Sequence, residues 1–227
     1  THKGQKLGSF GYASNFSFYY AHHMSTIEGG VVCTNDEEFY QVIKMMRGHG
    51  MLRESSNESI KQKITDKNSA LNPDFIFAFP GYNMRNTEIN AVMGRNQLKR
   101  LDANNLKRTE NFRIFLDHLD SKKFFVDYRF EGSCNYAFTL RLQDSDWILR
   151  DRIESRLRAE KVEFRRGMSG GGNQVRQPYL KQYFNLNLDP MAFPQTEKVH
   201  HFGWYIGNYP GLESEKIKAL CQLLNSI

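Results

Sequence analysis

Residues 17–30 read SFYYAHHMSTIEGG, and this stretch decides how the rest of the chain is interpreted. It begins with the hydroxyl of Ser17, has two adjacent histidines in its middle and ends in a Gly-Gly pair. The short segments on either side, Asn15–Tyr20 and Gly30–Thr34, have the composition of buried strands. A polar loop on an apolar sheet is a place where cofactors bind. Spacing alone also allows a hairpin loop with two solvated histidines, because no zinc-ligand pattern is completed nearby.

Helical patterns follow this loop. The segment Asp36–Arg47 has Asn35 or Asp36 as a cap, acidic residues in its first turn and basic residues near its end, so it is predicted to be a helix. Its inward face is expected to hold Phe39, Val42, Ile43 and Met46. Residues 51–74 are polar and predict a mobile excursion before the aromatic run Phe75–Phe79, which fits a core or a dimer interface.

A long helix is predicted from Thr87 to about Leu119, with a break expected near Ala103–Asn105 and with Ile89, Val92 and Leu98 on its apolar face. It divides the chain into two predicted domains, 1–102 and 103–227. The elements predicted after it are strand Asn135–Leu142, helix Ser145–Lys161, strand Val162–Arg166, a Gly-rich loop Gly167–Gly172, a short strand among loops in 191–209 and a final helix Ser214–Leu224. This order suggests a small α/β domain.

The composition narrows the function classes. The chain has 227 residues, 40% of them hydrophobic, and can bury at least one sizeable core. No apolar run approaches the ~20 residues that a bilayer span needs, which argues against a membrane protein. The net charge is +6, but the basic residues do not form a nucleic-acid-binding patch, because those between Arg150 and Arg166 are interleaved with acidic residues. Three dispersed cysteines, Cys33, Cys134 and Cys221, indicate buried thiols in the cytoplasm.

Three stretches carry a resemblance to a known family: residues 17–30, residues 81–94 (GYNMRNTEINAVMG) and the glycine-containing opening of residues 2–11. Together they resemble the DegT/DnrJ/EryC1/StrS sugar aminotransferases, which use pyridoxal 5′-phosphate (PLP). The resemblance implies the α/β fold of aspartate aminotransferase (fold type I). Residues 1–102 would be the C-terminal part of the PLP-binding large domain, and 103–227 a linker helix and the small domain. It also implies a homodimer, and it predicts that the chain is a fragment, since the first part of the large domain has no counterpart here.

Position 22 departs from the family pattern. In Ser-Phe-x-x-x-Lys-x-x-x-x-x-Glu-Gly-Gly, the lysine that bonds covalently to PLP is replaced here by His22. An imidazole cannot hold PLP in that way, so pyridoxamine 5′-phosphate (PMP) or noncovalent PLP is expected, with His22 as the catalytic base. A histidine at this position is similar to the 3-dehydratases that deoxygenate nucleotide-linked 4-keto-6-deoxy sugars.

Two branches of these dehydratases exist, and the cysteines distinguish them. One branch has an iron-sulfur cluster, which three dispersed cysteines cannot hold in one chain, so neither a cluster nor another metal is expected. Residues 165–174 (RRGMSGGGNQ) resemble the other branch, which acts on GDP-4-keto-6-deoxy-D-mannose in the colitose pathway of lipopolysaccharide O-antigen synthesis. In the implied reaction glutamate is the amino donor, His22 removes a proton at the cofactor's C4′ carbon and the C3 hydroxyl of the sugar leaves.

Other site residues follow from the same resemblance. Ser17 matches the family's phosphate-binding serine, and Asn83 matches an asparagine that reaches the cofactor of the neighbouring subunit. His49, Arg53 and Arg85 could receive the carboxylates of glutamate or the diphosphate of the nucleotide sugar. Each has a simpler reading: a strand end for Ser17, a turn for Asn83 and solvated side chains for the other three.

Several alternatives stay open from the sequence. The enzyme could be a nucleotide-sugar 4-aminotransferase in which the lysine was mutated. The chain could also be a truncated remnant that only dimerises or binds a partner. The loop Gly167–Gly172 could be a flexible element near the substrate or a simple connector, and His200-His201 is expected to pack rather than to bind a ligand.

Overall fold

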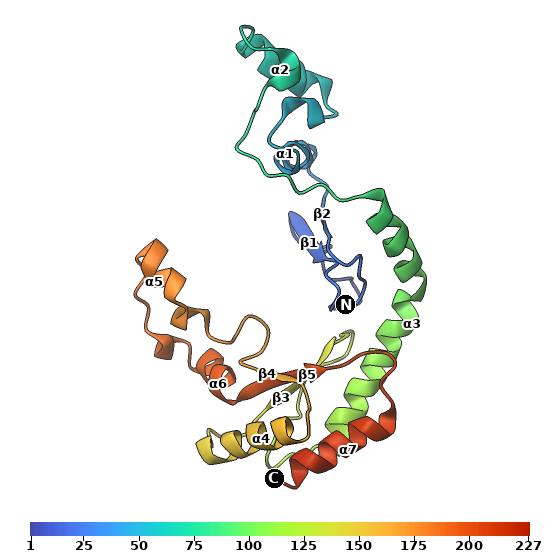
Figure 1. The fold of residues 1–227 in the computed structure, drawn as a ribbon, viewed down its shortest axis with the longest axis vertical. Helices are drawn as coiled ribbons and strands as arrows, with labels where there is room; N and C mark the ends of the chain where they lie inside the picture. The colour runs from blue at the N-terminus through green and yellow to red at the C-terminus, as the bar shows by residue number, and fades with distance from the viewer. The chain divides into compact units, whose positions relative to one another are not determined.

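The computed structural model describes all 227 residues, and the chain divides into two compact units, Thr1–Leu101 and Asp102–Ile227 (Figure 1). The long helix α3 (Glu88–His118) has residues in both. That these units are the later part of a large domain and a small domain stays a prediction. None of the helices is both long enough and apolar enough to cross a bilayer.

The first unit begins with a two-stranded antiparallel hairpin. Strands β1 (Ala13–Ser17) and β2 (Gly30–Thr34) pair with Ala13 opposite Thr34 and Ser17 opposite Gly30. The second strand is where the sequence predicts it, but β1 ends at Ser17 rather than at Tyr20. Both strands were expected to be buried, yet Phe16, Val31 and Val32 are 40–45% exposed and Cys33 is exposed. The reason is that a two-stranded sheet supplies no second layer to cover its apolar face.

Helix α1 (Glu37–Arg47) confirms the prediction for this segment, with the Asp36 carboxylate accepting a bond from the Phe39 N–H as its N-cap. After it come a 3-10 turn η1 (Leu52–Glu54), α2 (Glu58–Lys67) and a second 3-10 turn η2 (Pro73–Phe75). The segment 51–74, which the sequence predicts to be a mobile excursion, therefore contains one helix and two 3-10 turns. Helix α2 escaped notice because only Ile60 and Ile64 among its ten residues are apolar, although Asn57 caps it.

The core of the first unit is small. Met45, Leu52 and Ile76 are its buried members, and Ile64, Ala78 and Phe79 pack against them. The predicted inward face of α1 is only half-buried, since the helix turns Gln41 and Met45 inward instead. Within the aromatic run 75–79, Phe75 and Phe77 are more than half exposed. The first turns of α3 also expose their predicted apolar face, with Ile89 74%, Val92 66% and Leu98 60% exposed.

The second unit is built on a three-stranded antiparallel sheet in the order β3-β5-β4, formed by Ala137–Arg141, Gly203–Gly207 and Phe164–Arg166. Its helices are the C-terminal half of α3, α4 (Trp147–Ala159), α5 (Pro178–Phe184), α6 (Pro194–Phe202) and α7 (Ser214–Asn225). Short 3-10 turns lie at Gln174–Arg176 and Pro190–Ala192. Helix α3 runs without the break expected near Ala103–Asn105.

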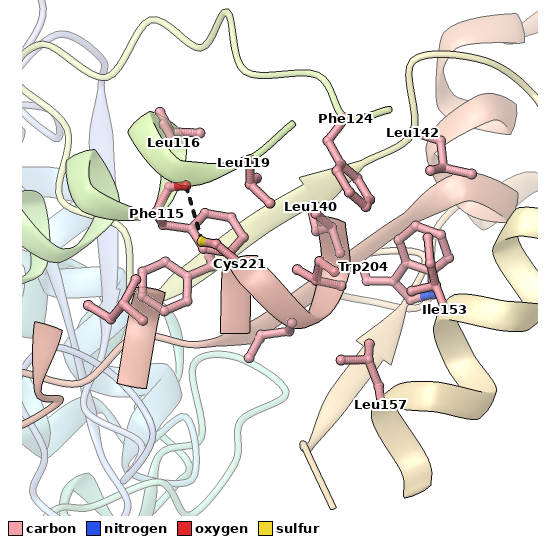
Figure 2. Close-up of a cluster of buried hydrophobic side chains, with 14 of the residues drawn as sticks. Phe115, Leu116, Leu119, Phe124, Leu140, Leu142, Ile153, Leu157, Trp204 and Cys221 are labelled. Atoms are coloured by element: carbon pink, nitrogen blue, oxygen red, sulfur yellow. Dashed lines mark hydrogen bonds between the residues drawn. The ribbon is translucent and has the colours of Figure 1, made fainter. Parts of the chain in front are cut away.

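In the core of this unit, side chains of the three-stranded sheet pack against side chains of four helices (Figure 2). Trp204 of β5 and Phe138 and Leu140 of β3 are fully buried. Phe115 of α3 stacks on Phe138 with ring centroids 4.5 Å apart, and the Cys221 thiol of α7 donates to the Phe115 carbonyl oxygen at 3.5 Å. Helix α4 contributes Ile153 and Leu157. The predicted order of strand, helix, strand, short strand and final helix is confirmed, whereas α5 and α6 were not predicted.

Candidate functional site

The hairpin loop between β1 and β2 has a defined backbone. Beyond Ser17 and Gly30 the pairing continues, since the Phe18 N–H donates to the Gly29 carbonyl oxygen at 2.8 Å. The Thr26 N–H then donates to the Phe18 carbonyl oxygen at 2.9 Å, and the His22 N–H donates to the Tyr19 carbonyl oxygen at 3.0 Å. These bonds close a tight turn around His22.

Helix α3 holds the exit of this loop. Asn90 donates from Nδ2 to the Glu28 carbonyl oxygen at 3.0 Å, and the Thr26 hydroxyl donates to the same oxygen at 2.8 Å. Thr26 is only 3% exposed. A Cβ on Gly29 would lie 2.5 Å from Thr26 Oγ1, so the first glycine of the Gly-Gly pair is required by close approach. Sequence reasoning did not identify Thr26 or Asn90.

The loop brings Ser17 and His22 into one short segment, as the sequence predicts. Ser17 is exposed, and its Oγ accepts from the Tyr19 N–H at 3.3 Å, which leaves the hydroxyl proton to donate elsewhere. The His22 side chain is half-buried, with its ring edge-on to the Tyr19 ring at 6.0 Å.

A second group of candidate residues lies at the C-terminal end of α1. The segment after Gly81 runs along this helix end: the His49 N–H donates to the Tyr82 carbonyl oxygen at 2.8 Å, and Gly48 bridges to Asn83. The backbones touch, since a Cβ on Gly81 would lie 2.1 Å from the Gly50 nitrogen. The structure therefore brings His49 and Asn83 together, although 34 positions separate them in the chain.

The two candidate arginines differ in their surroundings. The Arg85 guanidinium forms an ion pair with Glu54 at 2.6 Å, so its charge is already compensated. Glu54 was not identified from the sequence. Arg53 is exposed, with its guanidinium carbon 5.4 Å from the centre of the Phe75 ring and Nη1 at 3.5 Å from the Asp74 carbonyl oxygen. Arg53 is thus better placed than Arg85 to receive an anion.

The donor groups fit PLP or PMP held without a covalent bond. Residues 18–29 contain no lysine, so no amine is available there to bond to the cofactor's aldehyde. The Ser17 hydroxyl can donate to a phosphate oxygen, and the His22 imidazole can accept and return a proton. No group of three or more His, Cys, Asp or Glu side chains among the 227 residues is arranged to hold a metal ion.

Comparison with known proteins assigns the family. The model of the DegT/DnrJ/EryC1/StrS aminotransferase family matches residues 1–225. The chain belongs to this family. Among curated relatives of this aminotransferase family, the GDP-4-keto-6-deoxy-D-mannose 3-dehydratase of Yersinia pseudotuberculosis is 30% identical over 224 residues, covering 97% of this chain and 56% of that protein.

Solved structures of the aminotransferase family share the fold. A crystal structure of a ColD variant superposes with a TM-score of 0.83 at 26% identity, covering 99% of this chain and 58% of the other. The Escherichia coli GDP-4-keto-6-deoxy-D-mannose-3-dehydratase with bound hydrated PLP superposes with a TM-score of 0.79 at 24% identity, covering 99% of this chain and 57% of the other. This chain therefore has the PLP-dependent aminotransferase fold. It spans about half the length of the curated relatives it matches.

Proposed function

We propose that this chain belongs to a PLP/PMP-dependent 3-dehydratase that removes the C3 hydroxyl of a nucleotide-linked 4-keto-6-deoxy sugar. The observation that carries the proposal is His22, which stands in the hairpin loop where the family pattern has its lysine. The relatives support it, because the Yersinia pseudotuberculosis and Escherichia coli O55:H7 proteins are both named GDP-4-keto-6-deoxy-D-mannose 3-dehydratases. The proposed substrates are GDP-4-keto-6-deoxy-D-mannose and glutamate, in the cytoplasmic synthesis of a colitose-type lipopolysaccharide sugar.

The cofactor, when bound, supplies an amino group and an electron sink. His22 would remove a proton from the C4′ carbon of the cofactor. It would then give that proton to the departing C3 hydroxyl of the sugar, since one base near both atoms can serve both steps. The turn bond from the His22 N–H to the Tyr19 carbonyl oxygen fixes the backbone at His22, and the His22 ring lies edge-on to the Tyr19 ring. Orientation is what a base needs in order to act on one carbon selectively.

Binding roles follow from the donors in the two groups. Ser17 would hold the cofactor phosphate through its hydroxyl. Asn83 would reach the cofactor of a second subunit, which requires a homodimer. His49 and Arg53 would receive the carboxylates of glutamate or the sugar diphosphate, because guanidinium and imidazole N–H groups donate hydrogen bonds to such anions. Arg85 would act in the same region, with Glu54 fixing its direction.

Variants at position 22 test the reaction. His22→Ala is expected to lower ammonia release from GDP-4-keto-6-deoxy-D-mannose about 10²–10⁴-fold, the range for loss of a general base. His22→Lys is expected to create an absorbance band of covalently bound PLP that the native protein lacks. His23→Gln, in the adjacent position of the same loop, is the matched control and should keep most activity. Ammonia release that survives in His22→Ala would contradict the assignment of the base.

Cofactor binding separates the dehydratase from its rivals. The chain is titrated with PMP, both alone and fused behind the N-terminal region of its Yersinia relative, and binding is followed by fluorescence. Saturable binding that weakens in Ser17→Ala supports the proposal. A native protein that yields an amino sugar without ammonia is a transaminase instead. Absence of PMP binding in both forms would refute any PLP-dependent function and leave a remnant that only dimerises or binds a partner.

A further inference from the structure

The end of the hairpin loop is held at one atom, the Glu28 carbonyl oxygen. This oxygen accepts a bond from the Thr26 hydroxyl at 2.8 Å and one from Asn90 Nδ2 at 3.0 Å. Thr26 lies in the loop itself, whereas Asn90 lies in the first turn of α3, 62 positions from Glu28 in the chain. The second bond therefore ties the loop to a helix, and both bonds lie within the first unit.

The Asn90 amide is oriented from its other side. Its Oδ1 accepts from the Thr87 hydroxyl at 2.9 Å, which leaves Nδ2 to donate to the loop. Thr87 directly precedes α3. The donor that meets the Glu28 carbonyl oxygen is thus fixed by the beginning of a helix.

Thr26 also packs closely between the loop and α3. Its side chain is 3% exposed, and its Cγ2 would lie 3.1 Å from a Cβ on Gly94 of α3. On the other side, its Oγ1 would lie 2.5 Å from a Cβ on Gly29. The threonine fits because both neighbours are glycines, and at this point the loop lies directly against the helix.

The residue between these contacts has a strained backbone. Ile27 has φ +71°, in the left-handed region that a β-branched residue rarely adopts. Its side chain is 61% exposed, so burial does not compensate for the cost. Such strain persists only where the surrounding structure determines the backbone, and it is concentrated at active sites. The bonds at Thr26 and Glu28, on either side of Ile27, supply that constraint.

The same contacts determine where His22 lies. The Thr26 N–H donates to the Phe18 carbonyl oxygen at 2.9 Å, so residues 19–25 form a closed loop that contains His22. The sheet beneath this loop has only two strands. Because a two-stranded hairpin is marginally stable by itself, the contacts with α3 decide the position of the loop.

We propose that Thr26 and Asn90 are positioning residues, which hold the loop against α3 so that His22 reaches the C4′ carbon of the cofactor. This inference rests on the proposed dehydratase function. Neither residue acts on the reacting atoms, since both act through the backbone of the loop. Their effect on the rate is nevertheless large, because a displacement of about 1 Å can lower a rate about 100-fold.

Three substitutions change the two donors with little change of shape. Thr26→Val keeps the methyl group that faces Gly94 and removes the hydroxyl, whereas Thr26→Ser keeps the hydroxyl and is the rescuing variant. Asn90→Asp places a carboxylate oxygen against the Glu28 carbonyl oxygen. The carboxylate still accepts from Thr87, and a negative charge in the first turn stabilises a helix, so this variant should fold even where Thr26→Val does not.

Thr109→Val is the matched control. Thr109 lies further along the same helix, in the second unit, and its hydroxyl donates to the carbonyl oxygens of Asn105 at 3.1 Å and Ser133 at 3.0 Å. This variant removes a half-buried threonine hydroxyl without changing the hairpin.

The first readout is hydrogen exchange of peptides covering 18–29, which needs no cofactor. Exchange there should be at least about 10-fold faster than native in Thr26→Val and Asn90→Asp, and within about 2-fold of native in Thr26→Ser and Thr109→Val. Native exchange rates in both Thr26→Val and Asn90→Asp would overturn the proposal.

The second readout reports where residue 22 lies, independently of dehydration. In His22→Lys, the absorbance band of covalently bound PLP should form about 10-fold more slowly once Thr26→Val or Asn90→Asp is added. The measurement uses the form of the protein that binds PMP in the titration above. A band that forms at an unaltered rate would overturn the positioning role, even where exchange is faster.

The third readout separates chemistry from substrate affinity. With His22 present, Thr26→Val and Asn90→Asp should lower kcat for ammonia release about 10- to 100-fold while KM stays within about 2-fold. Thr26→Ser should keep kcat within about 3-fold of native. A change in KM alone would overturn the proposal. If the native protein releases no ammonia and His22→Lys shows no band, the proposed function fails, and the exchange data still decide whether Thr26 and Asn90 hold the loop.

Discussion

Arg85 and Glu54 form an ion pair at 2.6 Å that joins the segment after Gly81 to the turn that follows α1. Both side chains are partly exposed, 46% and 24%, and the Glu54 Cγ lies 2.8 Å from where a Cβ on Gly48 would be. The pair therefore supports the close approach of residues 48–50 and 81–84 that brings His49 next to Asn83. Its contribution to folding is modest, because solvent screens a partly exposed pair.

Arg85→Ala should lower the free energy of unfolding by about 0.5–1 kcal/mol, the upper part of the range for exposed ion pairs. Urea denaturation followed by circular dichroism measures the change. Glu54→Gln should give a similar loss, and the double variant should lose little more than either single one, because both remove the same interaction. Additive losses would show that the two side chains act separately. Lys107→Ala, which removes an exposed ion pair with Glu110 within one helix, serves as the control.

Local signals in the sequence predicted elements in which a cap and an apolar stripe occur together. Helix α1 was predicted from the cap at Asp36 and from the order of charges along its turns. Helices α5 and α6 were missed, although their N-terminal prolines, Pro178 and Pro194, were signals that could have revealed them. Helix α2 was missed because Ile60 and Ile64 are its only apolar residues, too few to mark a helical period in a polar segment.

The candidate site was predictable only where it is local. Ser17 and His22 lie in one loop between two strands, which the sequence shows directly. Other contacts join residues far apart in the chain. They are the approach of His49 to Asn83, the ion pair of Arg85 with Glu54, and the hydrogen bond from Asn173 to the Glu197 carboxylate. Such pairs leave no periodic pattern. The only local hint was the glycines that the close contacts require, Gly81 and Gly172 among them.

Acid should destabilise the second unit through Glu197. Its pKa is lowered to about 2 in the folded protein against the ordinary 4.5, chiefly by the hydrogen bond from Arg176, so the unfolded chain binds a proton more readily. A carboxyl with a lowered folded pKa stabilises the fold above pH 4.5, and that contribution is lost as the pH falls from 4.5 toward 2. The urea midpoint should therefore fall more steeply from pH 6 to pH 3 in the native protein than in Glu197→Gln. Parallel curves would show that Glu197 contributes nothing to this dependence.

The three thiols should react at different rates. Cys33 is exposed, whereas Cys221 is fully buried and its pKa is raised by burial to about 12, so almost no thiolate forms there at pH 8. Burial also raises the pKa of Cys134, against the opposing influence of Arg108. A thiol reagent such as DTNB should label one cysteine rapidly in the native protein and all three in urea. Cys33→Ser should abolish the rapid phase; its persistence would mean that Cys134 or Cys221 becomes accessible in the native state.

Removal of a buried leucine side chain in the second unit should cost far more stability than removal of an exposed one in the first. Leu140 on β3 is fully buried in the cluster around Trp204, so Leu140→Ala should cost about 2–5 kcal/mol, the range for emptying a packed core position. Leu98→Ala on α3 is the matched control, since that side chain is 60% exposed in the first unit and its loss should cost below about 0.5 kcal/mol. Thermal unfolding monitored by circular dichroism follows the helices of both units, and Trp fluorescence follows the second unit, because both Trp147 and Trp204 lie there. Equal losses from the two substitutions would mean that Leu98 is covered in solution, by a second subunit or by the region that the family's longer members have in addition.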